Sequence, residues 1–295
     1  MILLPASEFT LDELTDAYNQ TRTDYLIPMP MNPARLGEYI TLYDVDMVAS
    51  RVAVTGEQVV GLGMLGKRPG SGWLTRLGVL PEGRRQGVGS ALLQGLLDQA
   101  EAEGLSEVWL EVIKGNEPAR QLFLKYGFRP TRELVIGRRP PRAPRDMAAI
   151  LAADKIDYLQ HDEAIELHCD RHVRPNWLNA VESMRNVRRL AAVEEPGRET
   201  QHQTPHLSAI LVKFKDGASG WVSYQATALQ LKRICLEVRR GDEAAVAANL
   251  LAILHRLHAT QDATIENIPD DARWQGSQRA GYFEVFRRIE MVRQI

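Results

Sequence analysis

The side chains best suited to chemistry in this sequence lie in a short loop that joins an apolar run to an amphipathic segment. The apolar run ends at Pro81, and two arginines and two glycines follow within residues 84–90. From Val88 to Glu103 the apolar positions recur at helical spacing, and Gly104 suits the end of a helix. The first N–H groups of such a helix have no intrahelical partners, and the helix dipole adds partial positive charge there. This arrangement predicts a binding site for a phosphate group.

The residue types of the loop support this prediction. Gly87 and Gly89 remove the side chains that would keep a bulky anion from the backbone, and Arg84 and Arg85 add full positive charges. A P-loop is excluded because the sequence has no glycine followed, after four residues, by Gly-Lys-Ser/Thr. A dinucleotide fingerprint is excluded because Leu92 stands where its third glycine belongs. A glycine-rich turn that only starts a helix stays open as the alternative.

Two segments of the first half resemble the signatures of one enzyme family. The pattern Arg-x-x-Gly-x-Gly, after a strand that ends in Val-x-Pro, resembles the pyrophosphate loop of the GCN5-related N-acetyltransferases (GNAT). The segment 110–128, which contains Asn116 and ends in Tyr126-Gly127-Phe128, resembles the second signature of that family, at the expected distance from the first. The resemblance implies an enzyme that binds acetyl-CoA as a co-substrate and transfers its acetyl group to an amine.

The resemblance also implies roles for individual residues. In the family, the strand before the loop and the strand before the second signature splay apart, and the pantothenyl arm of the cofactor lies between them. Leu77 and Val79 would then offer backbone groups to the arm, Asn116 would contact it, and Tyr126 would face the sulfur. The cofactor-binding residues implied in this way are Leu77, Gly78, Val79, Arg84, Arg85, Gln86, Gly87, Val88, Gly89, Ser90, Asn116, Ala119 and Phe123.

The chemistry of such a site needs few groups. A neutral amine attacks the thioester carbonyl, backbone N–H groups near Gly78 stabilise the oxyanion, and the thiolate leaves. We interpret Tyr126 as the acid that protonates the thiolate, with a core aromatic that closes the last helical turn as the alternative. Glu111 is a candidate base that acts through water, with an edge-strand charge as its alternative. Asp44 and Asp46 rank below it.

The distribution of reactive side chains favours a direct transfer. All seven histidines and both cysteines lie after residue 160, so the first half has no imidazole or thiol. Direct attack by the acceptor in a ternary complex is therefore simpler than a cysteine-linked acyl-enzyme. Two other functions stay open: a non-catalytic CoA-binding or sensor module, and an acyltransferase with a different acyl-CoA donor, because the loop recognises the pyrophosphate and not the acyl chain.

Charge is the only constraint on the acceptor. Residues 1–46, which in the resembling family line the acceptor side, contain eight acidic and two basic residues. This surplus predicts a small, cationic amine as the acceptor, and solvated helix faces are the alternative interpretation. Homodimer formation is left open.

Composition bounds the class and location of the protein. The 295 residues suffice for two domains, and a net charge of −2 indicates neither a nucleic-acid footprint nor a polybasic membrane patch. No apolar run reaches the length of a membrane span, and the N-terminus lacks the basic start of a signal peptide. The two cysteines fit a reducing cytoplasm, where Cys235 is predicted to be a core residue. His168 and His172 stand one helical turn apart without a second ligand pair, so no metal site is predicted.

Periodicity predicts the elements that would position the loop. Alternation indicates a hairpin over 51–65 and strands over 73–79 and 107–113. The signals for helix ends are a capping box of Thr10 and Glu13, an N-cap at Asn116 and a left-handed residue at Gly127.

The second half repeats this pattern after a Pro- and Arg-rich stretch at 138–145 that indicates a linker. A hairpin is predicted over 211–224, and a glycine-to-valine spacing of 18 residues recurs at an offset of 159. The predicted fold class is α/β (α+β), with two tandem domains, each a mixed, mostly antiparallel sheet flanked by helices. The predicted division is a domain over 1–140, a linker over 141–150 and a second domain over 151–295.

The second copy is altered where the chemistry would occur. At the offset of 159, the first arginine and the two glycines of the loop are replaced by Glu243, Val246 and Ala248. An acid would repel a pyrophosphate, and a β-branched side chain would crowd it. We predict that the second half does not bind CoA in this mode, and that it packs on the first half and shapes the acceptor cleft.

Overall fold

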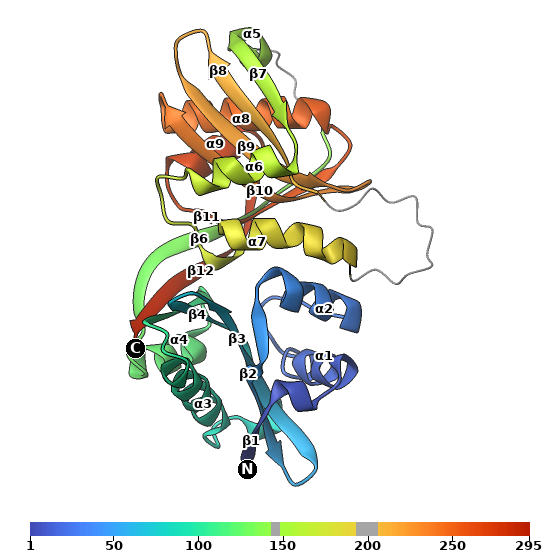
Figure 1. Ribbon diagram of the computed structural model, residues 1–295, viewed down its shortest axis with the longest axis vertical. Helices are drawn as coiled ribbons and strands as arrows, with labels where there is room; N and C mark the ends of the chain where they lie inside the picture. Colours follow the sequence, from blue (N-terminus) through green and yellow to red (C-terminus); the bar gives the residue numbers. More distant parts are fainter. Residues whose placement is uncertain (143–147, 193–205) are drawn as a thin grey trace. The chain divides into compact units, whose positions relative to one another are not determined.

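The computed structural model describes residues 1–142, 148–192 and 206–295. They form two compact units (Figure 1): the first unit is Met1–Thr131 with Glu290–Ile295, and the second unit is Arg132–Ile289. This division differs from the predicted boundary at 140, because a strand that starts at Arg129 runs on into the second unit and pairs there. Of the predicted linker 141–150, residues 143–147 lie outside the described residues.

The first unit is built around a mixed sheet. Its strands lie in the order β1-β2-β3-β4-β5, followed by the end of β12; the pairs from β1 to β4 are antiparallel, and β4 with β5 is parallel. The elements are β1 (Ile2–Pro5), α1 (Leu11–Gln20), α2 (Pro33–Leu42), β2 (Val45–Thr55), β3 (Gln58–Arg68), β4 (Ser71–Val79), α3 (Val88–Ala102), β5 (Glu107–Ile113) and α4 (Glu117–Lys125). The predicted hairpin and strands are confirmed, and the hairpin is longer than predicted.

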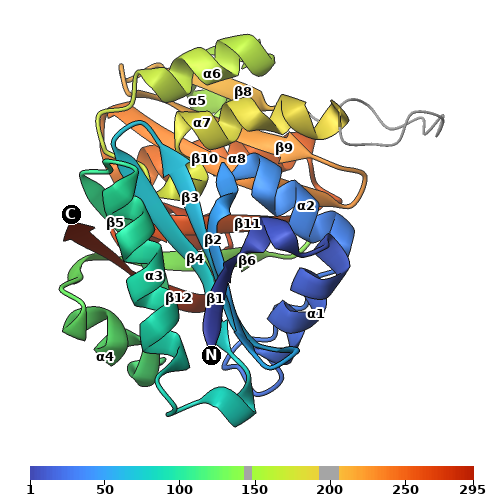
Figure 2. The ribbon, with the colours of Figure 1, turned by 60° about the horizontal axis from the view of Figure 1, so that its bottom comes forward.

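Helices cover both faces of this sheet, as Figure 2 shows for α1 and α3. The side chains of β2 point alternately to the two faces of the sheet. Val52 packs against α1 and α2 on one face, and its neighbour Ala53 packs against α3 on the other. The helix ends follow their local signals. Thr10 and Glu13 form both bonds of a capping box, and Gly127 has a φ of 83°.

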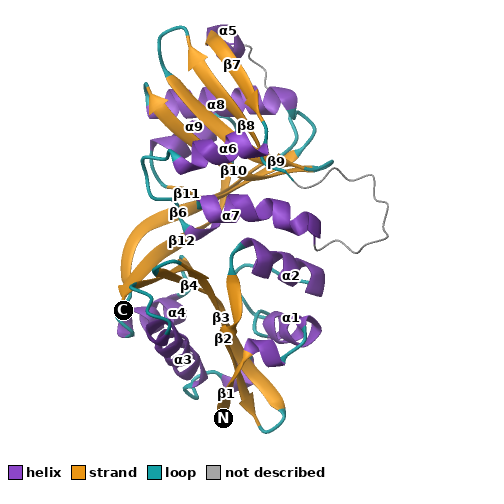
Figure 3. Ribbon diagram, in the orientation of Figure 1, coloured by secondary structure: helices purple, strands orange, loops and turns teal. Residues whose placement is uncertain are grey.

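The second unit has the same sequence of elements. Its strands lie in the order β6-β11-β10-β9-β8-β7, and the one parallel pair recorded in the described part of this unit is β10 with β11. The elements (Figure 3) are β6 (Arg129–Arg139), α5 (Ala148–Ala152), β7 (Ala153–Leu159), α6 (His161–Cys169), α7 (Val181–Arg185), β8 (Ser208–Phe214), β9 (Ser219–Ala226), β10 (Gln230–Arg240), α8 (Glu243–Leu257), β11 (Asp262–Pro269), α9 (Ala272–Arg279) and β12 (Phe283–Gln294). The predicted fold class, with mixed, mostly antiparallel strands flanked by helices in each unit, is thus confirmed.

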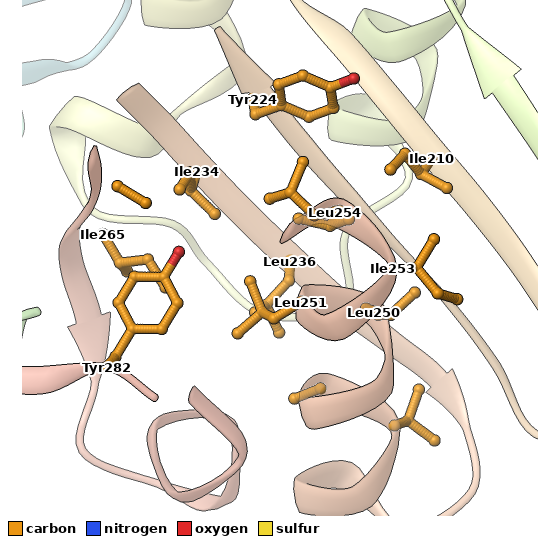
Figure 4. Packing of buried hydrophobic residues seen from close by; sticks show 14 of the residues in the cluster. Ile210, Tyr224, Ile234, Leu236, Leu250, Leu251, Ile253, Leu254, Ile265 and Tyr282 are labelled. Atoms are coloured by element: carbon orange, nitrogen blue, oxygen red, sulfur yellow. The ribbon is translucent and has the colours of Figure 1, made fainter. Parts of the chain in front are cut away.

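The core of the second unit lies mainly between α8 and the strands beside it (Figure 4). Leu250 and Leu254 of α8 are fully buried against strand residues such as Ile210 and Leu236. A separate cluster on α6 packs around Trp221, next to Val222 in the strand, so this sheet is also covered on both faces.

Both units contain a strand from a distant part of the chain. Residues 290–295 belong to the first unit, where the N–H of Ile295 donates to the carbonyl of Ser106 (3.0 Å) and the Thr131 hydroxyl donates to the carbonyl of Glu290 (3.1 Å). Most of β6, which follows the helices of the first half, belongs to the second unit and pairs with β11.

In the described part of the chain, no helix has both the length and the apolarity that crossing a membrane requires.

Candidate active site

The first unit contains a point where two parallel strands part. Strand β4 pairs with β5 from Ser71 to Leu74, and beyond Leu74 its recorded partners lie on β3 alone. At the parting, β4 has a bulge in which Arg76 has a φ of 54°. The backbone groups of residues 77–79 on the β5 side are therefore outside the sheet ladder, as the predicted splay requires.

Helix α3 begins beside this parting without a side-chain cap. Its N-cap residue, Gly87, has a φ of 84°, and no side chain accepts a bond from the first turn. A Cβ atom built on Gly87 would meet nothing within 4 Å, and one built on Gly89 would meet Val79 and Leu122 at 3.5 and 3.6 Å. The helix start thus has no side-chain cap, and a side chain at Gly87 would extend into open space, so these residues fit a pyrophosphate.

The two arginines of the loop differ in their environment. Arg84 forms an ion pair with Asp24, with Nη2 and Oδ1 2.7 Å apart, and its Nε donates to the Val79 carbonyl (3.2 Å). The hydrogen bond from Arg84 lowers the pKa of Asp24 below its usual range. The charge of Arg84 is therefore balanced by Asp24 within the chain. Arg85 is exposed and has a φ of 62°.

The start of α4 lies at the same site. The Asn116 side chain caps the helix by accepting from the N–H of Ala119 (3.3 Å), and its Nδ2 donates to the Tyr25 hydroxyl (3.2 Å). Two of the implied cofactor residues have other roles in this structure. The N–H of Ala119 is used in the cap, and Phe123 is a core residue, 7% exposed, against Phe128.

Tyr126, the C-cap residue of α4, reaches the first turn of α3. Its hydroxyl donates to the carbonyl of Ser90 (3.1 Å). This bond brings the candidate acid next to the loop that follows β4, although the two segments are 36 residues apart in sequence. Tyr126 is half-buried, and its hydroxyl is hydrogen bonded.

Glu111 lies on β5 near a group of aromatic side chains. Its carboxylate accepts from the indole Nε1 of Trp73 (2.8 Å), and Trp73 contacts the rings of Tyr39 and Tyr43. This hydrogen bond orients the carboxylate that we predict as the base.

The lower-ranked acids are engaged elsewhere. The Asp44 carboxylate binds Arg68 and the Asp46 carboxylate binds Lys67, each at 2.8 Å. The negative charges of Asp44 and Asp46 are therefore balanced by basic side chains of the chain. The Asp24–Arg84 pair balances a third acid, so part of the acidic surplus of residues 1–46 is neutralised.

Sequence reasoning missed one part of this site, the turn between α1 and α2. Arg22 donates to the Leu77 carbonyl (3.2 Å), Asp24 binds Arg84, and Tyr25 contacts Asn116. These pairs are 55, 60 and 91 residues apart. No local sequence pattern predicts contacts between residues so far apart. The opposite charges of Asp24 and Arg84 were the only signal that the sequence offered.

In the second unit, the start of helix α8 corresponds to the start of α3, and a side chain of the unit itself caps it. Only Gly241 and Asp242 separate β10 from α8, and the Asp242 carboxylate caps the helix by accepting from the N–H of Ala245 (2.8 Å). The correspondences at the offset of 159 are wrong here, because the loop is shorter. Glu243 is the first helical residue, and Val246 and Ala248 lie within α8.

The strands of the second unit also part, and side chains fill the opening. Strands β10 and β11 pair only at Gln230 and Leu231, and farther along the amides of Asn176 and Asn179 donate to the carbonyls of Asn267 (2.9 Å) and Glu266 (2.8 Å). The cavity that remains there has a volume of about 30 Å³, enough for about two water molecules. The described part of the second unit thus lacks the loop, and Asn176 and Asn179 bind the backbone where its strands part.

His168 of the second unit is a buried, hydrogen-bonded histidine. Its Nε2 lies 2.8 Å from the Ser223 hydroxyl, and burial lowers its pKa to about 3. The predicted burial of Cys235 is confirmed, at 5% exposed. Among residues 1–142, 148–192 and 206–295, no group of three His, Cys, Asp or Glu side chains is placed to hold a metal ion.

Comparisons with known proteins agree with this geometry. Residues 11–128 match the model of the acetyltransferase (GNAT) family. The [ribosomal protein bS18]-alanine N-acetyltransferase of Escherichia coli (strain K12) is 38% identical over 81 residues, which are 27% of this chain and 53% of that protein. A Shigella flexneri protein of the same name matches equally. The chain thus spans about half the length of these curated relatives.

Solved structures match the whole chain in fold. A GCN5-related N-acetyltransferase from Sphaerobacter thermophilus aligns with a TM-score of 0.67 and 16% identity, over 99% of this chain and 95% of that one. A tandem GNAT protein from the clavulanic acid biosynthesis pathway aligns with a TM-score of 0.63 and 14% identity, over 99% and 98%. At these identities the likeness concerns the fold alone.

Proposed function

We propose a function from the premise that residues 11–128 belong to the acetyltransferase (GNAT) family and that the whole chain has the fold of tandem GNAT proteins. The first unit binds acetyl-CoA as a co-substrate and transfers the acetyl group to a primary amine, and the second unit does not bind CoA. The observation that carries the proposal is the uncapped start of α3 at Gly87, beside the β4 edge that β5 leaves.

In the proposed complex, the pyrophosphate lies on the N–H groups of residues 87–90, and the arm of the cofactor lies along residues 77–79. The uncapped helix and the β4 residues without a β5 partner support this placement. The exposed Arg85 adds positive charge to the loop, which favours the same anion.

The transfer step needs three groups of the chain. The amine nitrogen forms a bond to the thioester carbon, the C–S bond breaks, and N–H groups near Gly78 stabilise the oxyanion between these events. Glu111 accepts the proton that the amine loses, through water, and Tyr126 gives its proton to the departing thiolate. The Trp73 bond to Glu111 and the position of Tyr126 beside α3 support these roles.

The acceptor is an amine of unassigned structure. The curated relatives are named for an alanine of a ribosomal protein, so peptide N-termini belong in an acceptor screen beside small amines. The ion pairs of Asp24, Asp44 and Asp46 weaken the argument for a cationic acceptor. The two unpaired cysteines are consistent with a cytoplasmic location, which we retain as part of the proposal.

Tyr126→Phe tests the mechanism. Removal of the acid should lower kcat about a hundredfold, because general acids contribute about 10²- to 10⁴-fold, and should leave the Kd for CoA within about twofold. The measurements are thiol release with an amine panel and calorimetric titration with CoA. Tyr158→Phe, on the exposed β7 edge, is the matched control.

Three outcomes would contradict the proposal in different ways. Unchanged kcat in Tyr126→Phe would exclude the phenol as the acid. One CoA bound per chain, with no amine of the panel acetylated, would favour the CoA-binding or sensor module instead. A faster reaction with another acyl-CoA would identify a different donor.

A further inference from the structure

Residues 22–25, in the turn that follows α1, occupy three groups of the proposed cofactor site at once. Arg22 Nη2 donates to the Leu77 carbonyl at 3.2 Å. Asp24 binds Arg84 at 2.7 Å, and the Tyr25 hydroxyl accepts from Asn116 Nδ2 at 3.2 Å. Leu77 lies on β4, Arg84 in the loop before α3 and Asn116 at the start of α4. A single turn therefore binds all three walls of the site.

Each contact has the chemistry of the cofactor group that the same wall would take. Arg22 offers an N–H to a strand carbonyl, as an amide of the pantothenyl arm would. The Asp24 carboxylate pairs with an arginine, as a phosphate would, and the Tyr25 hydroxyl accepts from an amide, as a carbonyl of the arm would. Residues 22–25 thus satisfy polar groups that would otherwise be unpaired at an open site.

The contacts of this turn are weak enough to exchange. The side chain of Asp24 is 57% exposed and that of Arg84 is 38% exposed, so water screens their attraction. Arg22 stacks on the Tyr25 ring at 4.0 Å, and its Nε is buried without a hydrogen-bond partner. An unsatisfied buried donor opposes the contacts that hold Arg22 in place.

We propose that residues 22–25 compete with CoA for its binding site. In the free protein they bind Leu77, Arg84 and Asn116, and CoA displaces them from these groups when it binds. This inference rests on the proposed function. It makes Asp24 and Tyr25 competitors of the cofactor, so that removing either side-chain group strengthens CoA binding. It also means that the turn leaves its position whenever CoA is bound.

Calorimetry on the full chain tests the competition. Asp24→Asn keeps the shape of the side chain and removes the charge, and it should lower the Kd for CoA about two- to fivefold, the range that an exposed ion pair provides. The matched control is Asp16→Asn, which removes the same charge from an exposed position on α1 and should change the Kd by less than about 1.5-fold.

Binding of pantetheine, which lacks the pyrophosphate, distinguishes the contact of Asp24 from that of Tyr25. Asp24→Asn should leave its Kd unchanged, whereas Tyr25→Phe should lower the Kd for both pantetheine and CoA. A second readout is trypsin cleavage after Arg22, which CoA should accelerate because the turn is released.

The outcomes distinguish this inference from the proposed function. If CoA binds but Asp24→Asn weakens or does not change its affinity, or if CoA protects Arg22 from trypsin, the turn is a permanent wall of the site and the inference is overturned while the proposed function stands. If neither the natural chain nor the variants bind CoA, both are overturned.

Discussion

Helices α3 and α8 occupy equivalent places in the two units, and they differ in what precedes them. Both contain 15 residues and follow a strand with a bulge. The cap of α3 is Gly87, after seven loop residues, whereas the cap of α8 is Asp242, after a single glycine. The start of α3 has no side-chain cap, and the Asp242 carboxylate accepts from one first-turn N–H group of α8. The two units therefore differ both in the cap and in the loop that an anion site would need.

The openings between the parallel strands differ in the same way. In the first unit, β4 and β5 part, and the carbonyls of Leu77 and Val79 accept from the long side chains of Arg22 and Arg84. In the second unit, Asn176 and Asn179 bind the carbonyls that the parting of β10 and β11 exposes. A copy that loses its ligand must pair these backbone groups internally, because buried unpaired groups cost free energy.

Lowering the pH should give the largest difference in stability between the two units. Burial lowers the pKa of His168 and His255 to about 3 in the folded state, against about 6.5 in the unfolded state. The unfolded state therefore binds more protons below pH 6.5, and stability that is present above that value is lost as the pH falls toward 3. From pH 7 to pH 5 the loss is about 2 kcal/mol per histidine, or about 4 kcal/mol for both.

Unfolding by urea at pH 7 and pH 5, followed by the fluorescence of Trp221 beside His168, measures this loss. The first unit contains no histidine and lacks this contribution. His255→Asn should reduce the pH dependence by about half, while exposed His172→Gln should leave it unchanged. Equal acid sensitivity of the two units would contradict the prediction.

Substitution of the α3 cap should give the next largest effect. Gly87→Val places a β-branched side chain in the space proposed for the pyrophosphate, and should weaken CoA binding at least about a hundredfold, or about 2.7 kcal/mol. Gly104→Val is the matched control: its φ of 68° is also left-handed, and a Cβ there also meets nothing within 4 Å.

Both variants should lose about 1–2 kcal/mol of stability from the backbone strain. Calorimetry should then find CoA bound to Gly104→Val and not to Gly87→Val. Equal loss of binding in both would attribute the effect to strain and remove the evidence for the site.

The cap of α8 should give the smallest effect. Asp242→Ala should cost about 1 kcal/mol of the free energy of unfolding, as is usual for a lost N-cap, and Asp242→Asn should retain most of it. Neither variant should bind CoA at a second site, because the loop is also missing. A second CoA per chain in Asp242→Ala would show that the cap alone distinguishes the two helices.

The sequence predicted those features that depend on near neighbours. The capping box at Thr10, the N-cap at Asn116 and the hairpins follow from residues a few positions apart, and the structure confirms them. The resemblance located the loop before α3 in the same way. These signals are local, so one sequence is enough to find them.

Features that depend on distant pairs were not predicted. Asp24 meets Arg84 across 60 residues, and no pattern in the sequence specifies that contact. The offset of 159 holds for the hairpins and fails at the loop, because a constant offset assumes loops of equal length. The division into units depends on distant pairs as well, since pairing with β11 places most of β6 in the second unit.

The strand that returns from the C-terminus to the first unit has a consequence for synthesis. Residues 1–131 leave the ribosome long before residues 290–295, and at about 5–20 residues per second the interval is roughly 8 to 33 s. During that time β5 lacks the neighbour that completes its edge, and an unpaired edge invites pairing with other chains. The first unit is therefore complete only after the last residues of the chain have been synthesised.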